Sequence, residues 1–280
     1  MAYIISGKNL AEKIKAELIE EVSRFSSKPV LAVVLVGEND ASKIYVNNKK
    51  KMAGEIGIDC QLFHLPAEVT EDELKRLLQA LAENLQIHGI MVQLPLPKHI
   101  SVKDVLSLIP ASKDVDGLGA YNTGLLHQND DRALVAATPQ GVLYMLKSTG
   151  VDLCGKHAVI IGRSNIVGRP MMSLLLNNDC TVTVVHSRTK NIEQIVAQAD
   201  IVVAACGQAK IVKKNWVKKG ATVIDVGINR LDEKLCGDVD FEDVSEVAEY
   251  ISPVPGGVGP MTVIMLMKNT CLAYKRQQGK

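Results

Sequence analysis

Features that would place the chain in a membrane or outside the cell are missing from the sequence. No apolar run reaches the length needed to span a bilayer. The first residues, MAYIISGKNLAEKIKAEL, turn polar too soon for a secretory signal. The six cysteines lie far apart and include no C-x-x-C pair. We therefore expect reduced thiols, no membrane partner and a cytoplasmic protein.

An excess of charge of one sign is also lacking. The 32 basic and 31 acidic residues leave a net charge of +1, which gives no argument for nucleic acid as a partner. The six histidines are dispersed without an H-x-x-x-H pair, so no metal site is expected. An apolar content of 47% in 280 residues is ordinary for a globular protein of one large or two smaller domains.

Short apolar runs alternate with amphipathic helical patterns along the chain. In the first half, strands are predicted at residues 30–37, 60–65 and 89–94, and the second intervening helix starts with a Thr70–Glu73 capping box. The runs HAVIIG, TVTVVHS, DIVVAAC and ATVIDVG predict a second series. Continuous apolar strands between helices are typical of α/β domains with mainly parallel sheets flanked by helices.

The two series are separated by residues 119–141, which have little periodicity and are expected to be loop-rich. Thr138 then resembles an N-cap, with Pro139 at the first helical position. We expect a first domain at residues 1–137, joined by a C-terminal helix at residues 264–280, and a second domain at residues 138–263. Two such domains predict a cleft between them, where ligands usually bind.

The stretch KHAVIIGRSNIVGRPM follows the first predicted strand of the second domain and leads into a helix. Gly162 permits a tight turn and Gly168 permits close approach of helix and sheet, while Arg163 and Ser164 add a charge and a hydroxyl. Backbone N–H groups at a helix N-terminus favour an anion. The full G-x-G-x-x-G is absent, so an ordinary turn is the alternative, but the position favours a Rossmann-like dinucleotide site.

The second strand of that domain ends in VVHSRTK. NAD sites normally carry Asp or Glu here, and an acid repels a 2′-phosphate. Ser187 and Arg188 instead offer a hydroxyl and a guanidinium, which favours NADP. The alternative is that Arg188 is a solvated loop charge.

Tyr45 and Lys49 are four residues apart on a predicted helix and share a face with Ser42. A tyrosine and a lysine that converge on a ligand can stack on a flat substrate and move protons. The positive field of Lys50 and Lys51 is expected to lower the pKa of Lys49. On spacing alone, however, a solvated basic helix face is the better interpretation.

Three further stretches change that balance. MVQLPLP places Gln93 at the end of a strand, KDVDGL places Asp116 before Gly117, and PVPGGVGPMT precedes the last helix. Together with YVNNK and GRSNIVGRPM, in this order over nearly the whole chain, they resemble the bifunctional methylenetetrahydrofolate dehydrogenase/methenyltetrahydrofolate cyclohydrolase family.

The resemblance implies an activity. Such enzymes oxidise 5,10-methylenetetrahydrofolate with NADP and hydrolyse the 5,10-methenyltetrahydrofolate to 10-formyltetrahydrofolate, a step of one-carbon metabolism and purine biosynthesis, as homodimers. The resemblance also implies that Lys49 is the principal catalytic residue of hydrolysis and that Gln93 orients Lys49. Tyr45 would stack on the folate, and Asp116 would bind the donor edge of the pterin.

The resemblance also assigns the remaining site residues. The further substrate-binding residues are Ser42, Pro255, Gly256 and Gly257. The cofactor-binding residues are Gly162, Arg163, Ser164, Gly168, Ser187, Arg188, Ile228 and Thr262, of which Ile228 and Thr262 would lie near the nicotinamide. Asn165 departs from the pattern, because some relatives carry a basic residue there, and this puts one phosphate contact in doubt.

Other functions fit less well. Short-chain dehydrogenases also use Y-x-x-x-K, but their nucleotide loop precedes the pair, whereas Tyr45 precedes Gly162 here. A shikimate-type NADP-dependent dehydrogenase has the same domain order and is the main alternative, although it would not explain VQLPLP or PVPGGVGPMT. A non-catalytic binding module would not need Tyr45, Lys49 and Gln93 together.

Overall fold

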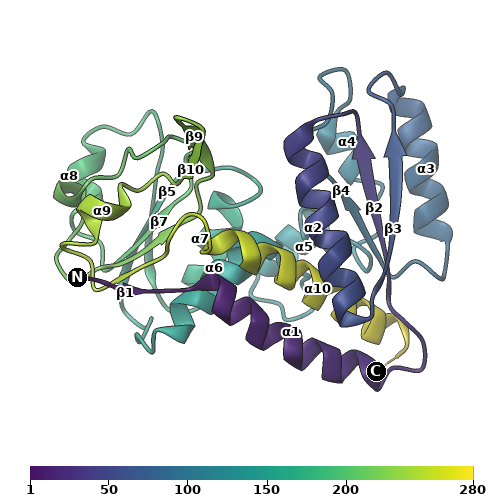
Figure 1. The fold of residues 1–280 in the computed structure, drawn as a ribbon, viewed down its shortest axis with the longest axis horizontal. Coiled ribbons are helices and arrows are strands. Elements are labelled where there is room, and N and C mark those ends of the chain that lie inside the picture. The colour runs from purple at the N-terminus through teal and green to yellow at the C-terminus, as the bar shows by residue number, and fades with distance from the viewer. Residues whose placement is uncertain (280) are drawn as a thin grey trace. The chain divides into compact units, whose positions relative to one another are not determined.

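The computed structural model describes residues 1–279 as two compact α/β units (Figure 1). The six-stranded unit comprises Met1–Glu12 and Thr138–Thr262, and the three-stranded unit comprises Lys13–Ala137 and the segment from Val263 onward. The predicted fold class, with mainly parallel sheets flanked by helices, is confirmed. Within the described residues, no helix is long and apolar enough to cross a membrane.

The sheet of the three-stranded unit is parallel, with the order β3-β2-β4. Its strands are β2 (Val30–Val36), β3 (Asp59–Leu65) and β4 (Gly89–Val92). Alternate β2 residues, such as Val34, pack against Leu74 and Leu78 of α3, and every β2 residue after Val30 is buried. The helices of this unit are α2 (Asp40–Ile56), α3 (Glu71–Glu83), α4 (Val102–Leu106), α5 (Ala120–His127) and most of α1 (Gly7–Ser23) and α10 (Val258–Gln277).

The sheet of the six-stranded unit is also parallel, with the order β1-β11-β8-β7-β5-β6. Its strands are β1 (Tyr3–Ile4), β5 (His157–Ile161), β6 (Thr181–Val185), β7 (Ile201–Ala204), β8 (Thr222–Asp225) and β11 (Tyr250–Ile251). The other elements are α6 (Ala137–Ser148), α7 (Gly168–Leu176), α8 (Ile192–Val196), η1 (Lys214–Trp216), α9 (Phe241–Val244) and the antiparallel hairpin β9 (Asn229–Leu231) with β10 (Lys234–Cys236). Because the chain runs from β5 to β6 on one side and continues with β7 on the other, the order reverses at β5. A reversal of this kind marks the ligand crevice of open α/β sheets.

The structure differs from the sequence-based division at the N-terminus. Residues 1–12, expected in the first domain, cluster with the six-stranded unit. The cause is β1, which pairs in parallel with β11 nearly 250 positions later, as Tyr3 opposite Tyr250 and Ile4 opposite Ile251. A two-residue strand has no periodicity to reveal it.

Two local predictions between the domains are wrong. The stretch expected to be loop-rich contains α5 over Ala120–His127. The next helix, α6, begins at Ala137, so Thr138 lies in its first turn and is not an N-cap. The Thr138 hydroxyl is instead 2.9 Å from the Thr262 hydroxyl. The Thr70–Glu73 capping box is confirmed, with both of its hydrogen bonds formed.

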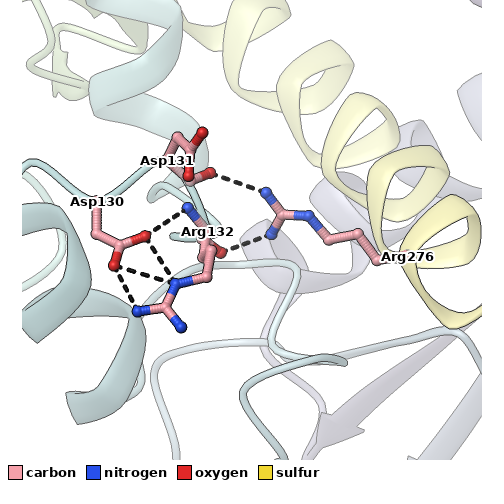
Figure 2. A network of polar contacts seen from close by, with 4 residues as sticks. All are labelled: Asp130, Asp131, Arg132 and Arg276. Atoms are coloured by element: carbon pink, nitrogen blue, oxygen red, sulfur yellow. Dashed lines mark hydrogen bonds and ion pairs between the residues drawn. The ribbon is translucent and has the colours of Figure 1, made fainter. Parts of the chain in front are cut away.

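Helix α10 holds the segment that follows α5. The Arg276 guanidinium donates to the carbonyls of Arg132, at 2.6 Å, and Asp131, at 2.9 Å, while the Arg132 side chain pairs with Asp130 (Figure 2). Nearer the start of the helix, buried Asn269 donates to the carbonyls of residues 115 and 135, both at 2.8 Å. This apparently irregular segment is therefore fixed by side chains from the far end of the sequence.

Candidate active site and cofactor-binding loops

Lys49 lies on the buried face of α2. The Asn39 side chain caps this helix by accepting the Ser42 N–H at 3.0 Å. From Ser42 the buried positions recur at helical spacing, and they include Lys49 with 7% of its surface exposed. Lys50 and Lys51 point to solvent. The interpretation of a solvated helix face therefore fails at Lys49 itself.

Gln93 directly follows β4 and contacts Lys49. The Lys49 ammonium donates to Gln93 Oε1 at 2.9 Å and lies 3.3 Å from the sulfur of Met91. Gln93 Nε2 donates to the Leu94 carbonyl at 2.7 Å. Since the amide nitrogen is used there, the amide oxygen must face the lysine.

The electrostatic environment of Lys49 is unusual for a lysine. Burial lowers its pKa, and the negative charge of Asp116 opposes that shift. The direction matches our expectation, but its cause does not, because Lys50 and Lys51 are not the source. Burial also raises the pKa of Asp116 to about 6, against the pull of the Lys49 ammonium.

The turn that carries Asp116 is built by its neighbours. Gly117 has φ +68°, and a Cβ there would lie 2.5 Å from backbone. Asp114 is 3% exposed and accepts the Gly119 N–H at 2.8 Å and Asn122 Nδ2 at 3.0 Å. Asp114 is therefore a structural acid, which leaves the half-buried Asp116 available for a ligand.

Tyr45 and Ser42 complete this group on α2. Tyr45 is half-buried and burial raises the pKa of its phenol, so it stays neutral over the physiological range. Ser42 is 4% exposed. The structure thus places Ser42, Tyr45 and Lys49 on one helix, joins Lys49 to Gln93, and couples it electrostatically to Asp116.

The loop between β5 and α7 in the six-stranded unit depends on its two glycines. Gly162 has φ +124°, and a Cβ there would lie 2.1 Å from the Ala205 carbonyl oxygen. A Cβ at Gly168 would lie 2.3 Å from the Gly162 carbonyl oxygen. Neither position has room for a larger residue. These two glycines therefore bring the loop and the helix together here without the third glycine of G-x-G-x-x-G.

Arg163 and Ser164 are both exposed in this loop. The Ser164 hydroxyl oxygen accepts the N–H groups of Val167, at 3.2 Å, and Gly168, at 3.4 Å. Because its oxygen accepts both bonds, its proton is free to be donated to an anion. The loop can therefore offer a hydroxyl donor and a guanidinium to a phosphate.

The end of β6 also presents donors. Ser187 and Arg188 are exposed just beyond Val185, and the Arg188 N–H donates to His186 Nδ1 at 3.2 Å. Neither Arg163 nor Arg188 forms an ion pair with a carboxylate of residues 1–279. Two unpaired guanidinium groups beyond β5 and β6, with no acid at the end of β6, fit the phosphates of NADP.

The PVPGG loop packs against the start of α1. The Gly256 carbonyl accepts the Lys8 N–H at 3.0 Å, and a Cβ at Gly7 would lie only 1.8 Å from the Gly257 oxygen. Pro255 is exposed and Gly257 is buried. The loop shape therefore requires glycine on both sides of the contact.

The two residues expected beside the nicotinamide also lie in the six-stranded unit. Ile228 is 50% exposed, so its side chain is accessible to a ligand. Thr262 shares its hydroxyl contact with Thr138. Thr138 was expected only as a helix cap, yet its hydroxyl contacts a candidate cofactor-binding residue.

Three further residues of the two units, Met91, Asp225 and Asp238, were not identified from the sequence. Met91 contacts Lys49 but reads only as a strand residue. Asp225 ends β8 and Asp238 follows β10, and both are buried. A carboxylate at the end of the apolar run ATVID was a usable signal, whereas nothing in GDVDF distinguishes Asp238. No group of three or more candidate metal ligands occurs in the described part of the chain.

Known proteins resemble the chain over its whole length. It is 52% identical over 280 residues to a bifunctional protein FolD from Listeria innocua, covering 99% of this chain and 98% of the relative. The FolD methylenetetrahydrofolate dehydrogenase/cyclohydrolase structure from Campylobacter jejuni superposes with a TM-score of 0.97 at 46% identity, covering 99% of both chains. The enzyme from Trypanosoma brucei, solved with NADP cofactor and an inhibitor, gives 0.95 at 42% identity, with 100% and 99% covered.

The alternative suggested by domain order is much more distant. Shikimate dehydrogenase from Aquifex aeolicus superposes with a TM-score of 0.54 at 16% identity, covering 91% of this chain and 94% of that one. This likeness shows the fold alone.

Family models match both parts of the chain. Residues 5–116 match the tetrahydrofolate dehydrogenase/cyclohydrolase catalytic domain, and residues 136–278 match the NAD(P)-binding domain of the same family. The chain belongs to the tetrahydrofolate dehydrogenase/cyclohydrolase family.

Proposed function

We propose that the protein oxidises 5,10-methylenetetrahydrofolate to 5,10-methenyltetrahydrofolate with NADP and then hydrolyses the product to 10-formyltetrahydrofolate. The observation that carries the proposal is the buried Lys49 ammonium, bonded to Gln93 at 2.9 Å, in a chain of this family. A lysine buried at an energetic cost needs a reason beyond packing, because such groups cluster at functional sites.

Hydrolysis uses the three-stranded unit. Water adds to the methenyl carbon and loses one proton. Its second proton is transferred to N5 as the bond between that carbon and N5 breaks, and the remaining oxygen becomes the formyl C=O on N10. Lys49 handles the proton or polarises the water, and its lowered pKa makes the neutral amine accessible. Gln93, fixed by its bond to Leu94, holds the lysine in one orientation.

Substrate binding uses acceptors and a flat surface. Asp116 as a carboxylate is acceptor-only, which suits the amino and imino N–H groups on the edge of the pterin ring. Tyr45, neutral and half-buried, offers a ring for stacking, with Ser42 one turn earlier. The loop of Pro255, Gly256 and Gly257, in which Pro255 is exposed, lies against the folate.

Oxidation uses residues of the six-stranded unit. NADP, when bound, supplies the hydride acceptor. Gly162 and Gly168 shape the loop that receives the pyrophosphate, where Arg163 and Ser164 donate. Ser187 and Arg188 bind the 2′-phosphate, and Ile228 and Thr262 bound the nicotinamide. Because Gly162, Arg163, Ser164 and Gly168 are all present, Asn165 costs at most one peripheral contact.

The family also supports a setting for the protein. Its product is a one-carbon donor of the kind used in purine biosynthesis. We place the enzyme in the cytoplasm, as a homodimer, with a small folate as its partner and neither nucleic acid nor a membrane. We assign the folate to the unit of residues 13–137, which includes most of α10, and the cofactor to the unit of residues 138–262, which includes residues 1–12.

An absorbance assay with methylenetetrahydrofolate and NADP tests the activity. NADPH formation and the methenyl compound are followed together, and 10-formyltetrahydrofolate is measured at the end. Both activities are expected in the purified protein. An enzyme that reduces NADP with shikimate but not with the folate would overturn the proposal.

A further inference from the structure

Two buried carboxylates lie in the six-stranded unit at the ends of β8 and β10. Asp225 is 3% exposed and is the last residue of β8, while Asp238 is fully buried and follows β10. Neither bonds to a lysine, arginine or histidine side chain within residues 1–279. Buried, unpaired carboxylates are rare, because burial without a partner is costly. Their presence therefore calls for a role.

Asp238 fills a nest of backbone N–H groups in the loop after β7. It accepts from Cys206 at 2.6 Å, Gly207 at 2.9 Å and Gln208 at 2.9 Å, with Gly207 at φ +67°. Successive N–H groups of this kind often bind phosphate. Because an internal carboxylate occupies them, this loop is unavailable to the cofactor phosphates. The loop after β5 is left to receive the pyrophosphate.

Asp238 also reaches the segment after β8. Its Oδ1 accepts Asn229 Nδ2 at 2.9 Å. One carboxylate thus holds both the loop 206–208 and the segment 226–229, which contains Ile228. These two segments leave the carboxyl ends of neighbouring strands.

Asp225 in turn holds Asp238. Its oxygens accept the N–H groups of Gly227 at 3.0 Å, Asp238 at 2.9 Å and Val239 at 2.9 Å. A Cβ at Gly227 would lie 2.2 Å from the Asp238 carboxylate, and one at Gly237 would lie 1.8 Å from that of Asp225. The backbone is therefore shaped around the two acids.

The pair carries negative charge beneath these segments. Burial, opposed by three backbone N–H groups and aided by the charge of Asp238, raises the pKa of Asp225 to about 7. At pH 8 the Asp225 carboxyl is therefore mostly ionised.

We infer that Asp238, supported by Asp225, is a positioning residue for the nicotinamide half of NADP and favours the oxidised cofactor over the reduced one. The inference rests on the proposed function, in which Ile228 lies beside the nicotinamide. The oxidised ring is cationic and the reduced ring is neutral, so a fixed anion stabilises NADP more than NADPH. Loops already ordered before binding also reduce the entropy lost when the cofactor binds.

Calorimetric titration with NADP and with NADPH at pH 8 tests this on the full chain. In Asp238→Asn the Kd for NADP should rise more than that for NADPH, so that the preference for NADP falls about three- to tenfold. Asp240→Asn is the matched control. It removes the same charge two residues away, from a side chain that pairs with Lys213 at the surface, and should leave the ratio unchanged.

Two further measurements separate positioning from damage to the fold. Amide exchange of residues 206–208 should accelerate in cofactor-free Asp238→Asn, because three acceptor contacts are weakened. Hydrolysis of methenyltetrahydrofolate needs no nicotinamide, so its rate should stay within about twofold of the parent. Should Asp238→Asn fail to fold, Asp225→Asn, which keeps an amide oxygen for two of its three N–H donors, should show the same change of ratio.

Equal weakening of NADP and NADPH, or no weakening of either, in a variant that folds would overturn the inference. A parent protein that neither binds NADP nor oxidises methylenetetrahydrofolate would instead overturn the proposed function. The two failures are therefore distinct.

Discussion

The two units prepare their ligand sites in opposite ways. The three-stranded unit buries its reactive groups: Lys49 is 7% exposed, and burial shifts the pKa of both Lys49 and Asp116. The six-stranded unit leaves Arg163 and Arg188 exposed to solvent. It buries the carboxylates of Asp225 and Asp238, which accept hydrogen bonds from N–H groups of the same unit. Chemistry on the substrate needs a desolvated group with an altered proton affinity, whereas holding a cofactor needs donors on a fixed frame.

The difference predicts steep losses in one unit and graded losses in the other. A buried group acts as part of a coupled set, so removing it changes the state of its neighbours. An exposed guanidinium contributes one charged hydrogen bond that solvent and salt already weaken.

The largest effect is expected at Lys49. Lys49→Met keeps the aliphatic stem and removes the ammonium, so cyclohydrolase kcat should fall about 10²–10⁴-fold, the usual contribution of a positioned proton-transfer group. Dehydrogenase activity should remain measurable, with methenyltetrahydrofolate accumulating in the absorbance trace. Lys49→Arg should rescue hydrolysis only partly, because a guanidinium does not readily release a proton.

Lys50→Met is the control, since Lys50 is the exposed neighbour on the same helix. It should leave both rates near those of the parent. Parental hydrolysis by Lys49→Met would remove Lys49 from the mechanism.

Asp116→Asn should have the next largest effect. Loss of one charged hydrogen bond, at about 1.5–3 kcal/mol, lowers affinity for a reduced folate roughly 10- to 150-fold. The fall should exceed this, because the amide also turns an N–H donor toward a ring donor. Calorimetry with 5-formyltetrahydrofolate measures this directly. Asp131→Asn, an exposed acid of the same unit, is the control, and unchanged folate binding by Asp116→Asn would contradict the assigned role.

Arg188→Ala tests the graded unit. Loss of one charged hydrogen bond should raise the KM for NADP roughly 10- to 150-fold while the KM for NAD changes little. The effect should shrink as salt increases, unlike the effect at Lys49. Arg24→Ala, which removes an arginine of the other unit, is the control and should leave the KM for NADP and the KM for NAD unchanged. If the parent uses NAD and NADP equally well, the 2′-phosphate assignment fails.

The smallest effect is a pH dependence. Burial raises the pKa of Asp116 to about 6, so the carboxylate is present above that pH and is lost as pH falls through it. Folate affinity should drop about twofold at pH 6 relative to pH 8 and about tenfold one unit lower. Asp116→Asn should abolish this dependence. A flat profile in the parent would show that the ring does not select the ionised carboxylate.

The contrast also explains what could be predicted from sequence. The seven longer strands and the capping box are local patterns, so composition and period reveal them. Strand β1 and the position of residues 1–12 depend on pairing with Tyr250 and Ile251, which leaves no local trace. Helix α5 was missed because its apolar residues Leu125 and Leu126 are adjacent and so show no helical period.

Prediction of the candidate site followed the same rule. The residue types and spacing of Tyr45, Lys49 and Gln93 were legible, but the burial that lowers the pKa of Lys49 comes from the packing of α2 and β4. Lys50 and Lys51, whose charges were expected to lower the pKa of Lys49, are exposed to solvent and do not cause that shift. The role of Asp238 could not be recognised from the sequence, because its hydrogen-bond partners, residues 206–208, lie about 30 positions away.

The interleaved chain bears on how the protein is made by the ribosome. Strand β1 cannot pair until β11 has been synthesised. The core of the three-stranded unit is incomplete until α10, whose Tyr274 is fully buried, has been synthesised. Neither unit can therefore finish folding until β11 and α10 have been synthesised. If the gene were cut between codons 137 and 138, residues 1–12 would be separated from the six-stranded unit. The segment from Val263 onward would be separated from the three-stranded unit. The two activities are thus tied together in biosynthesis, since neither half can be released as a complete protein.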